Sequence, residues 1–85
     1  MTSKLEQIQV TETIDCSDLL CPLPVYQVAL AFEHLATGDV LEVIATDPGS
    51  LEDIPALARQ RGDAVLATET RGLRHHFWLE KGGSR

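Results

Sequence analysis

Apolar and polar residues alternate at strand spacing and then recur at helical spacing, and these two patterns predict the first elements of the chain. Residues 7–15 alternate apolar and polar side chains and are rich in β-branched types, which predicts a strand. A short loop over 16–20 follows. From Pro22 to about Ala36 apolar side chains recur at helical spacing, which predicts a helix. Val40–Ala45 is a short apolar run that is typical of a central strand.

A second helix is expected to end at about Arg61. Ser50 and Asp53 resemble a capping box at its start, although Glu or Gln is usual at the later position. Pro55 lacks an N–H group, so either the helix starts nearer Asp53 or its first turn is irregular. The side chains expected to face the core are Leu51, Ile54, Leu57 and Ala58.

The end of the chain predicts a hairpin. Strands are expected over Ala64–Thr70 and Arg74–Lys81, around a turn that contains Gly72. Alternation along the last strand separates Phe77 and Leu79 from a second set of side chains, namely His76, Trp78 and Glu80. His76 and Glu80 indicate that this second face of the sheet is partly solvated.

These elements predict an α/β chain with the order β-α-β-α-β-β. Because β-α-β crossovers are right-handed, both helices are expected on one face of a four-stranded mixed sheet, as an α+β two-layer sandwich. The 85 residues suffice for one small domain over 1–85, with frayed tails at 1–6 and 82–85.

Composition and charge narrow the classes of function. The hydrophobic fraction of 44% suits a globular core, and the formal net charge of −6 argues against direct nucleic-acid binding. The sequence shows no signal peptide, and its most apolar stretch, Leu19–Phe32, is too short to cross a bilayer. We therefore expect a cytoplasmic protein with no membrane partner.

The charge is unevenly distributed. Between Glu6 and Asp53 there are ten acidic residues and no lysine or arginine, whereas six basic and three acidic residues lie from Arg59 onward. Cys21 lies in the acidic half, so any lowering of its pKa must come from a helix terminus or from cations that folding brings near.

Cys21-Pro22-Leu23-Pro24 is the stretch with the clearest chemical signal. Proline disfavours the helical conformation of the residue before it and fits the first helical position, so we expect Cys21 to be the N-cap of the first helix. The positive end of the helix dipole would then lower the pKa of the thiol and favour a nucleophilic thiolate. From the residues alone, a buried apolar cysteine remains the alternative.

The second cysteine predicts no metal centre. Cys16 lies five residues before Cys21, which is neither the redox spacing CxxC nor that of a zinc ribbon. A site that also used His75 and His76 is conceivable, but adjacent residues of a strand point to opposite faces and chelate poorly. We expect no metal and no bound cofactor.

The order of several short motifs resembles a known family. Asp15-x-x-Asp18-Leu19-x-Cys21-Pro22-x-Pro24 is similar to the DxxGLxCPxP signature of the TusA/SirA family of small sulfur-carrier proteins. CPxP is the specific part. The resemblance continues along nearly the whole chain, with Gly38-Asp39, Thr46-Asp47-Pro48, Asp53-Ile54-Pro55, Glu69-Thr70-x-Gly72 and Lys81-Gly82-Gly83.

This resemblance implies a two-layer fold of the same element order and a sulfur-carrier function. Cys21 would carry sulfane sulfur as a persulfide, and Pro22 and Pro24 would shape its turn. Asp15 and Asp47 match motif positions for which we expect structural roles at a strand end and a turn.

The partners implied by the resemblance are proteins. The sulfur would come from a cysteine desulfurase or a rhodanese-like donor and pass to a DsrE-type or other thiol acceptor. The destinations in such a family include tRNA thiolation, sulfur oxidation and cofactor assembly. We expect a monomeric relay without its own cofactor rather than an enzyme in its own right.

The chain departs from the family pattern at three places. Asp18 stands where the signature has glycine, which predicts a different loop conformation before the thiol. Basic residues are frequent on the first helix in the family, but this chain has Ala29 and Leu30 there. Tyr26 and Leu30 lie four residues apart, which favours apolar docking of a partner. Cys16 is extra; it is interpreted as structural, with a resolving thiol as the alternative.

Two other functions stay open from the sequence. Cys16 and Cys21 could form a thiol–disulfide pair, although no redox motif is present. A non-catalytic regulatory or interaction domain is also compatible, because one fold can serve several roles.

Overall fold

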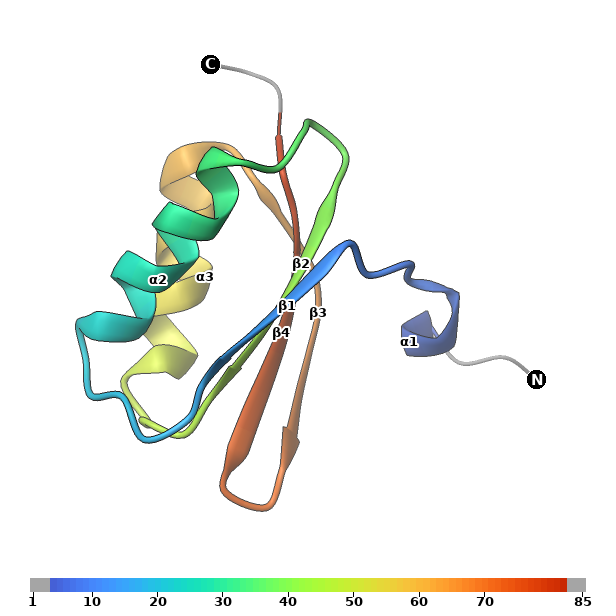
Figure 1. Cartoon of the computed structure of the whole chain (residues 1–85). Coiled ribbons are helices and arrows are strands. Elements are labelled where there is room, and N and C mark those ends of the chain that lie inside the picture. The colour runs from blue at the N-terminus through green and yellow to red at the C-terminus, as the bar shows by residue number, and fades with distance from the viewer. Residues whose placement is uncertain (1–3, 83–85) are drawn as a thin grey trace.

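Two layers, one of helices and one of strands, make up the computed structural model, which describes residues 4–82 (Figure 1). Within this range no helix is long and apolar enough to cross a membrane. The elements are α1 (Lys4–Gln7), β1 (Glu12–Cys16), α2 (Leu23–Glu33), β2 (Val40–Ala45), α3 (Ser50–Arg61), β3 (Ala64–Arg71) and β4 (Arg74–Glu80).

The sheet has four strands in the order β1-β2-β4-β3. β1 pairs with β2 in parallel, and β4 pairs antiparallel with both β2 and β3. α2 and α3 lie together on one face of the sheet, and the short α1 lies on the opposite side (Figure 1). The expected fold class, a four-stranded mixed sheet with two helices on one face, is confirmed.

The hydrophobic core fills the space between the two long helices and the sheet. Phe77 and Leu79 point into it as the alternation of the last strand predicts, and β2 is buried as a central strand. Burial of these apolar side chains is the main driving force for folding. The core cluster is Cys16, Val28, Ala31, Phe32, Leu35, Leu41, Val43, Ala45, Ile54, Ala58, Phe77 and Leu79.

The first strand is shorter than predicted. It begins at Glu12 rather than at Gln7, and it ends at Cys16, which was expected in a loop. The reason is the available partner: β2 begins only at Val40, whose carbonyl accepts a hydrogen bond from the Thr11 N–H at 2.8 Å. Residues before Thr11 therefore have no neighbouring strand with which to pair.

The termini differ in part from the expected frayed tails. Lys4–Gln7 form α1, and the Gly82 N–H donates to Asp63 Oδ1 at 2.8 Å. A Cβ atom at Gly82 would meet the Gly62 carbonyl oxygen, so glycine is required by close approach of the two backbones. Residues 1–3 and 83–85 of the expected tails lie outside the described residues.

α3 begins at Ser50, earlier than the alternative start near Asp53, and contains Pro55 inside it. The expected capping box is wrong: Gly49 is the N-cap, and no side chain caps the helix. Leu51 was expected to face the core, but it is exposed, because the buried line runs through Ser50, Ile54 and Ala58 at helical spacing. Gly62, with φ of 85°, ends the helix as predicted.

The second sheet face is more buried than predicted. His76 and Trp78 are both buried, and their rings stack with centroids 5.8 Å apart. His76 Nδ1 lies 3.1 Å from Glu42 Oε2 on the neighbouring strand. The expectation of a partly solvated His76 is therefore wrong, because its ring packs on Trp78 and its Nδ1 has a carboxylate partner in Glu42. Glu80 is half-buried.

Lys81 ties the end of β4 to the end of α2. α2 ends at Glu33, three residues before the predicted end, and its last carbonyl groups need partners from outside the helix. Lys81 Nζ donates to the Phe32 and Leu35 carbonyl oxygens, each at 2.5 Å. A cation at this position also interacts favourably with the negative end of the helix dipole.

We predict that Lys81→Met lowers the free energy of unfolding by about 1–3 kcal/mol. The methionine keeps the apolar stem, but two carbonyl groups lose a charged donor. Urea denaturation measures this change. Arg74→Met, at an exposed position at the start of β4, is the control, with an expected change within about 0.5 kcal/mol. Equal stability of Lys81→Met and Arg74→Met would contradict the capping role.

Candidate functional site

The thiol site is built where two loops meet at one edge of the sheet. Parallel pairing of β1 with β2 aligns Cys16 with Ala45 at the strand ends, so the loops that follow them leave the same edge. The Asp18 N–H donates to Thr46 Oγ1 at 2.8 Å and links the two loops directly. The first loop leads to Cys21, and the second leads to the start of α3.

Two carboxylates from the second loop and from α3 contact Cys21. The Cys21 N–H donates to Asp47 Oδ2 at 2.8 Å, and the Cys21 thiol donates to Asp53 Oδ2 at 2.7 Å. Gly49 lies against the same group: a Cβ there would be 3.3 Å from Asp47 Oδ2 and 3.7 Å from the Cys21 Cβ. Cys21 itself is exposed. The site is therefore an accessible sulfur held from one side by acidic side chains.

The start of α2 differs from the predicted N-cap. Pro22, not Cys21, occupies the N-cap position, and the Cys21–Pro22 peptide bond is cis. The Leu23 N–H donates to the Leu20 carbonyl at 2.8 Å, so it is not available to the sulfur. Pro24 is buried within the first turn. The prolines shape the turn, but they place the thiol beside the helix start rather than on it.

The pKa of the Cys21 thiol is raised above its ordinary value, which contradicts the expected lowering. The largest cause is the hydrogen bond from the thiol to Asp53, followed by burial and by the negative charges of Asp53 and Asp47. All three effects favour the neutral thiol over the thiolate. The helix dipole does not prevail, because Cys21 is one residue outside the cap and its thiol contacts the Asp53 carboxylate directly.

The backbone conformation of Asp18 shows why the family motif has glycine at this position. Its φ is 68°, in the left-handed region that glycine adopts readily and that aspartate tolerates better than most residues. Aspartate was predicted to change the conformation of the loop. Instead, Asp18 adopts the left-handed conformation that is typical of glycine.

The remaining predicted residues are spread around this centre. The Asp15 carboxylate accepts a hydrogen bond from the Ser17 N–H at 2.9 Å, which stabilises the turn after β1. Cys16 is 1% exposed in the core, and burial raises the pKa of its thiol. Both cysteines are free. Among residues 4–82 no three His, Cys, Asp or Glu side chains are grouped so that they could hold a metal.

The surface beside the thiol is apolar. An open groove of about 310 Å³ lies between α2 and α3 next to Cys21; it is lined by Pro22, Val25, Tyr26, Asp53, Ala56, Leu57 and Gln60. Leu20 in the preceding loop and Leu23, Tyr26 and Leu30 on α2 are exposed, Tyr26 by 58% and Leu30 by 55%, and of these Tyr26 lines the groove. We call these four side chains the apolar rim. Tyr26 and Leu30 thus lie on the outer side of the helix, as the sequence predicts.

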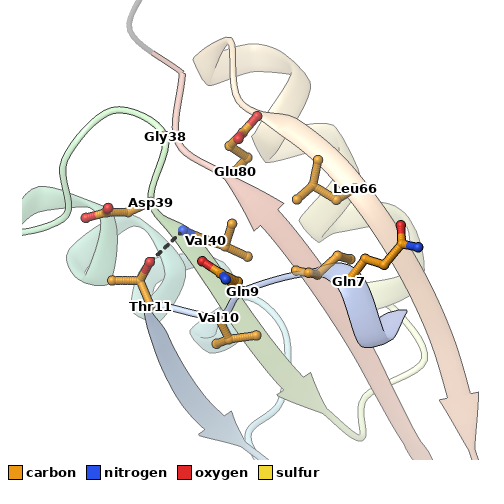
Figure 2. A pocket seen from close by; sticks show the side chains of 10 residues that line it. Gln7, Gln9, Val10, Thr11, Gly38, Asp39, Val40, Leu66 and Glu80 are labelled. Carbon is orange, nitrogen blue, oxygen red and sulfur yellow. Dashed lines mark hydrogen bonds between the residues drawn. The ribbon is translucent and has the colours of Figure 1, made fainter. Parts of the chain in front are cut away.

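A separate pocket of about 590 Å³ lies at the opposite end of β1 and β2 (Figure 2). It is formed by residues 7–11, 38–40, Leu66 and Glu80, and the Val40 N–H donates to Thr11 Oγ1 across it at 3.1 Å. Its lining contains neither cysteine nor histidine. This pocket is therefore not part of the thiol site.

Asp53 is the residue of the candidate site whose contact the sequence did not predict. It was interpreted as part of a capping box, whereas its side chain accepts the hydrogen bond of a thiol 32 residues earlier. The Asp53-Ile54-Pro55 motif match was the available signal, but it did not indicate a contact with Cys21. Asp47 was expected to have a turn role; its side chain accepts the Cys21 N–H and so links the two loops.

Comparisons with known proteins identify one family. Residues 12–81 match the family model described as Sulfurtransferase TusA. The chain is 39% identical over 70 residues to the sulfur carrier protein TusA of Allochromatium vinosum, covering 82% of this chain and 92% of that one.

Two longer relatives match in part of their length. The putative sulfur carrier protein YrkF of Bacillus subtilis is 40% identical over 78 residues, which are 89% of this chain and 41% of that one. A putative sulfur carrier protein of Aquifex aeolicus is 40% identical over 77 residues, which are 91% of this chain and 39% of that one. The chain thus spans less than half of these two relatives.

We predict that Asp18→Gly leaves the free energy of unfolding unchanged or raises it by up to about 1 kcal/mol. Glycine removes the strain of a positive φ, and its greater entropy loss on folding offsets part of this gain. Asp18→Val should lower stability by about 1–3 kcal/mol, because β-branched residues fit this region poorly. Chemical denaturation tests both. A glycine variant less stable than the valine variant would contradict the strain argument.

Proposed function

The chain belongs to the TusA family of sulfur carrier proteins, and from this premise we propose that it carries sulfane sulfur as a persulfide on Cys21. The observation that carries the proposal is that Cys21, the cysteine of the CPxP motif, is exposed at an edge of the sheet, whereas Cys16 is buried in the core. A carrier needs a thiol that two different partners can reach in turn.

The proposed loading step is a thiol exchange that balances without an external oxidant. The Cys21 thiol loses its proton, and the thiolate attacks the outer sulfur of a persulfide on the donor. A new S–S bond forms at Cys21 as the donor's S–S bond breaks, and the donor leaves as a thiolate that takes up a proton. In the delivery step an acceptor thiol attacks the outer sulfur on Cys21, and Cys21 is released.

The neighbouring residues would position this sulfur rather than react. Pro22 and Pro24 stiffen the turn between β1 and α2, Asp15 stabilises its start, and Asp47 holds the backbone at Cys21. In this proposal the chain acts without its own cofactor, and the partners supply the chemistry. The donor is a cysteine desulfurase or a rhodanese-like protein, and the acceptor is a DsrE-type or other thiol protein.

The apolar rim is the proposed docking surface for the sulfur donor. Transfer requires contact between the two sulfur atoms, so a donor must cover the exposed side chains beside Cys21. The side chains of the apolar rim carry no charge, and α2 has no lysine or arginine, so contact at the rim depends on buried apolar area more than on ion pairs. A disulfide relay between Cys16 and Cys21 has no supporting observation, because Cys16 is in the core.

We predict that the protein gains the mass of one sulfur atom when it is incubated with a donor. The donors to test are a cysteine desulfurase with cysteine and a rhodanese with thiosulfate, and the readout is intact mass under non-reducing conditions. Cys21→Ser should abolish the gain, and Cys16→Ser should retain it. No gain with either donor, or an undiminished gain in Cys21→Ser, would contradict the proposed function.

We predict that Tyr26→Ser slows loading by a protein donor by about tenfold or more, because an exposed aromatic anchor beside the thiol is lost. The substitution is neutral, so the alkylation rate of Cys21 by iodoacetamide should stay unchanged. Val10→Ser, an equally neutral change at an apolar position that lines the pocket at the far end of the sheet, is the matched control. Equal loading of both variants would exclude the rim as the docking surface.

A further inference from the structure

We infer that Asp53 is a gate on the empty carrier: its carboxylate holds the Cys21 sulfur as a protonated thiol until a sulfur-donating partner displaces this contact. The inference rests on the proposed function and deepens it, because it assigns control of the reactive sulfur to a residue outside the CPxP motif. In the free protein, the contact with Asp53 makes Cys21 a poor nucleophile.

The contact between the two residues specifies where the proton is. Asp53 Oδ2 lies 2.7 Å from Cys21 Sγ, and a carboxylate has only acceptors to offer, so the sulfur must be the donor. A thiolate at the same place would put two negative atoms in contact. Because a carboxylate is a much weaker base than a thiolate, the proton stays on sulfur rather than on oxygen. The geometry thus favours restraint of the thiol over its activation.

The charges around Cys21 act in the same direction. The segments that form the site, residues 17–33 and 46–56, contain no lysine, arginine or histidine. Their charged side chains are Asp18 in the first loop, Glu33 at the far end of α2, Asp47 in the second loop, and Glu52 and Asp53 in the first turn of α3. Asp53 and Asp47 act on the thiol, and no cation of these segments offsets them.

The position of Asp53 makes displacement feasible. Its side chain is half-buried at the edge of the open groove between α2 and α3, where a docking protein would reach it. Loading requires that the Cys21 proton leave before the sulfur attacks, and the departing donor thiolate takes up one proton, so the step is balanced. What the partner must supply is an interaction that competes for the Asp53 carboxylate.

Asp53→Asn tests the gate directly, because it keeps the shape of the side chain and removes its charge. The rate of Cys21 alkylation by iodoacetamide is measured against pH in the free protein, in a Cys16→Ser background. We expect the midpoint of the profile to move to lower pH and the rate at neutral pH to rise by about threefold or more, since a like charge is lost while each thiolate becomes slightly less nucleophilic.

Glu52→Gln is the matched control. It removes the same charge from the same helical turn, but Glu52 is exposed and does not contact the sulfur, so its profile should follow the wild type. An unchanged or slower Asp53→Asn, or a Glu52→Gln shift of equal size, overturns the gate. Loading of the wild type and of Asp53→Asn by the protein donor is measured in parallel. If the wild type is not loaded, the sulfur-carrier function is refuted. The alkylation profiles then still test whether Asp53 restrains the Cys21 thiol.

Discussion

The parallel pairing of β1 with β2 is the constraint on which the thiol site depends. It aligns Cys16 with Ala45, so the chain leaves both strands at the same edge of the sheet. Three hydrogen bonds then join the two departing segments: from Asp18 to Thr46, from the Cys21 backbone to Asp47, and from the Cys21 thiol to Asp53. A shift of this pairing by one residue would invert the faces of β1 and separate the groups.

The sequence was sufficient for the elements whose side chains repeat regularly. β2, α3 and the hairpin are close to the predicted ranges, because the spacing of their apolar residues follows which side chains are buried. The first strand was overextended, since alternation over 7–15 reports a local preference and not the presence of a neighbour with which to pair. The end of α2 was also misplaced, because Lys81, which caps it, lies 46 residues away from Leu35.

The candidate site shows the same division between local and tertiary information. Cys21 was identified from its prolines and from the motif, which are local features. The sign of its pKa shift was predicted wrongly, because the sequence showed an acidic half around Cys21 but not which carboxylates folding brings to the thiol. Tertiary structure brings Asp53 to the sulfur and Asp47 to the Cys21 N–H, and a carboxylate 2.7 Å from the sulfur outweighs the dipole of a helix that begins two residues later.

In the proposed function, the thiol contact would distinguish the empty carrier from the loaded one. Once a second sulfur is bonded to Sγ, that atom has no proton and cannot donate to Asp53, so the hydrogen bond of the empty state is lost. The reactive outer sulfur then lies about 2 Å beyond Sγ, past the atom that Asp53 contacts. On this reasoning the carboxylate restrains the protein before loading and has less hold on it afterwards. The reactivity of such a carrier would therefore follow its sulfur content, and the acidic surroundings of Cys21 would protect the empty thiol without blocking delivery.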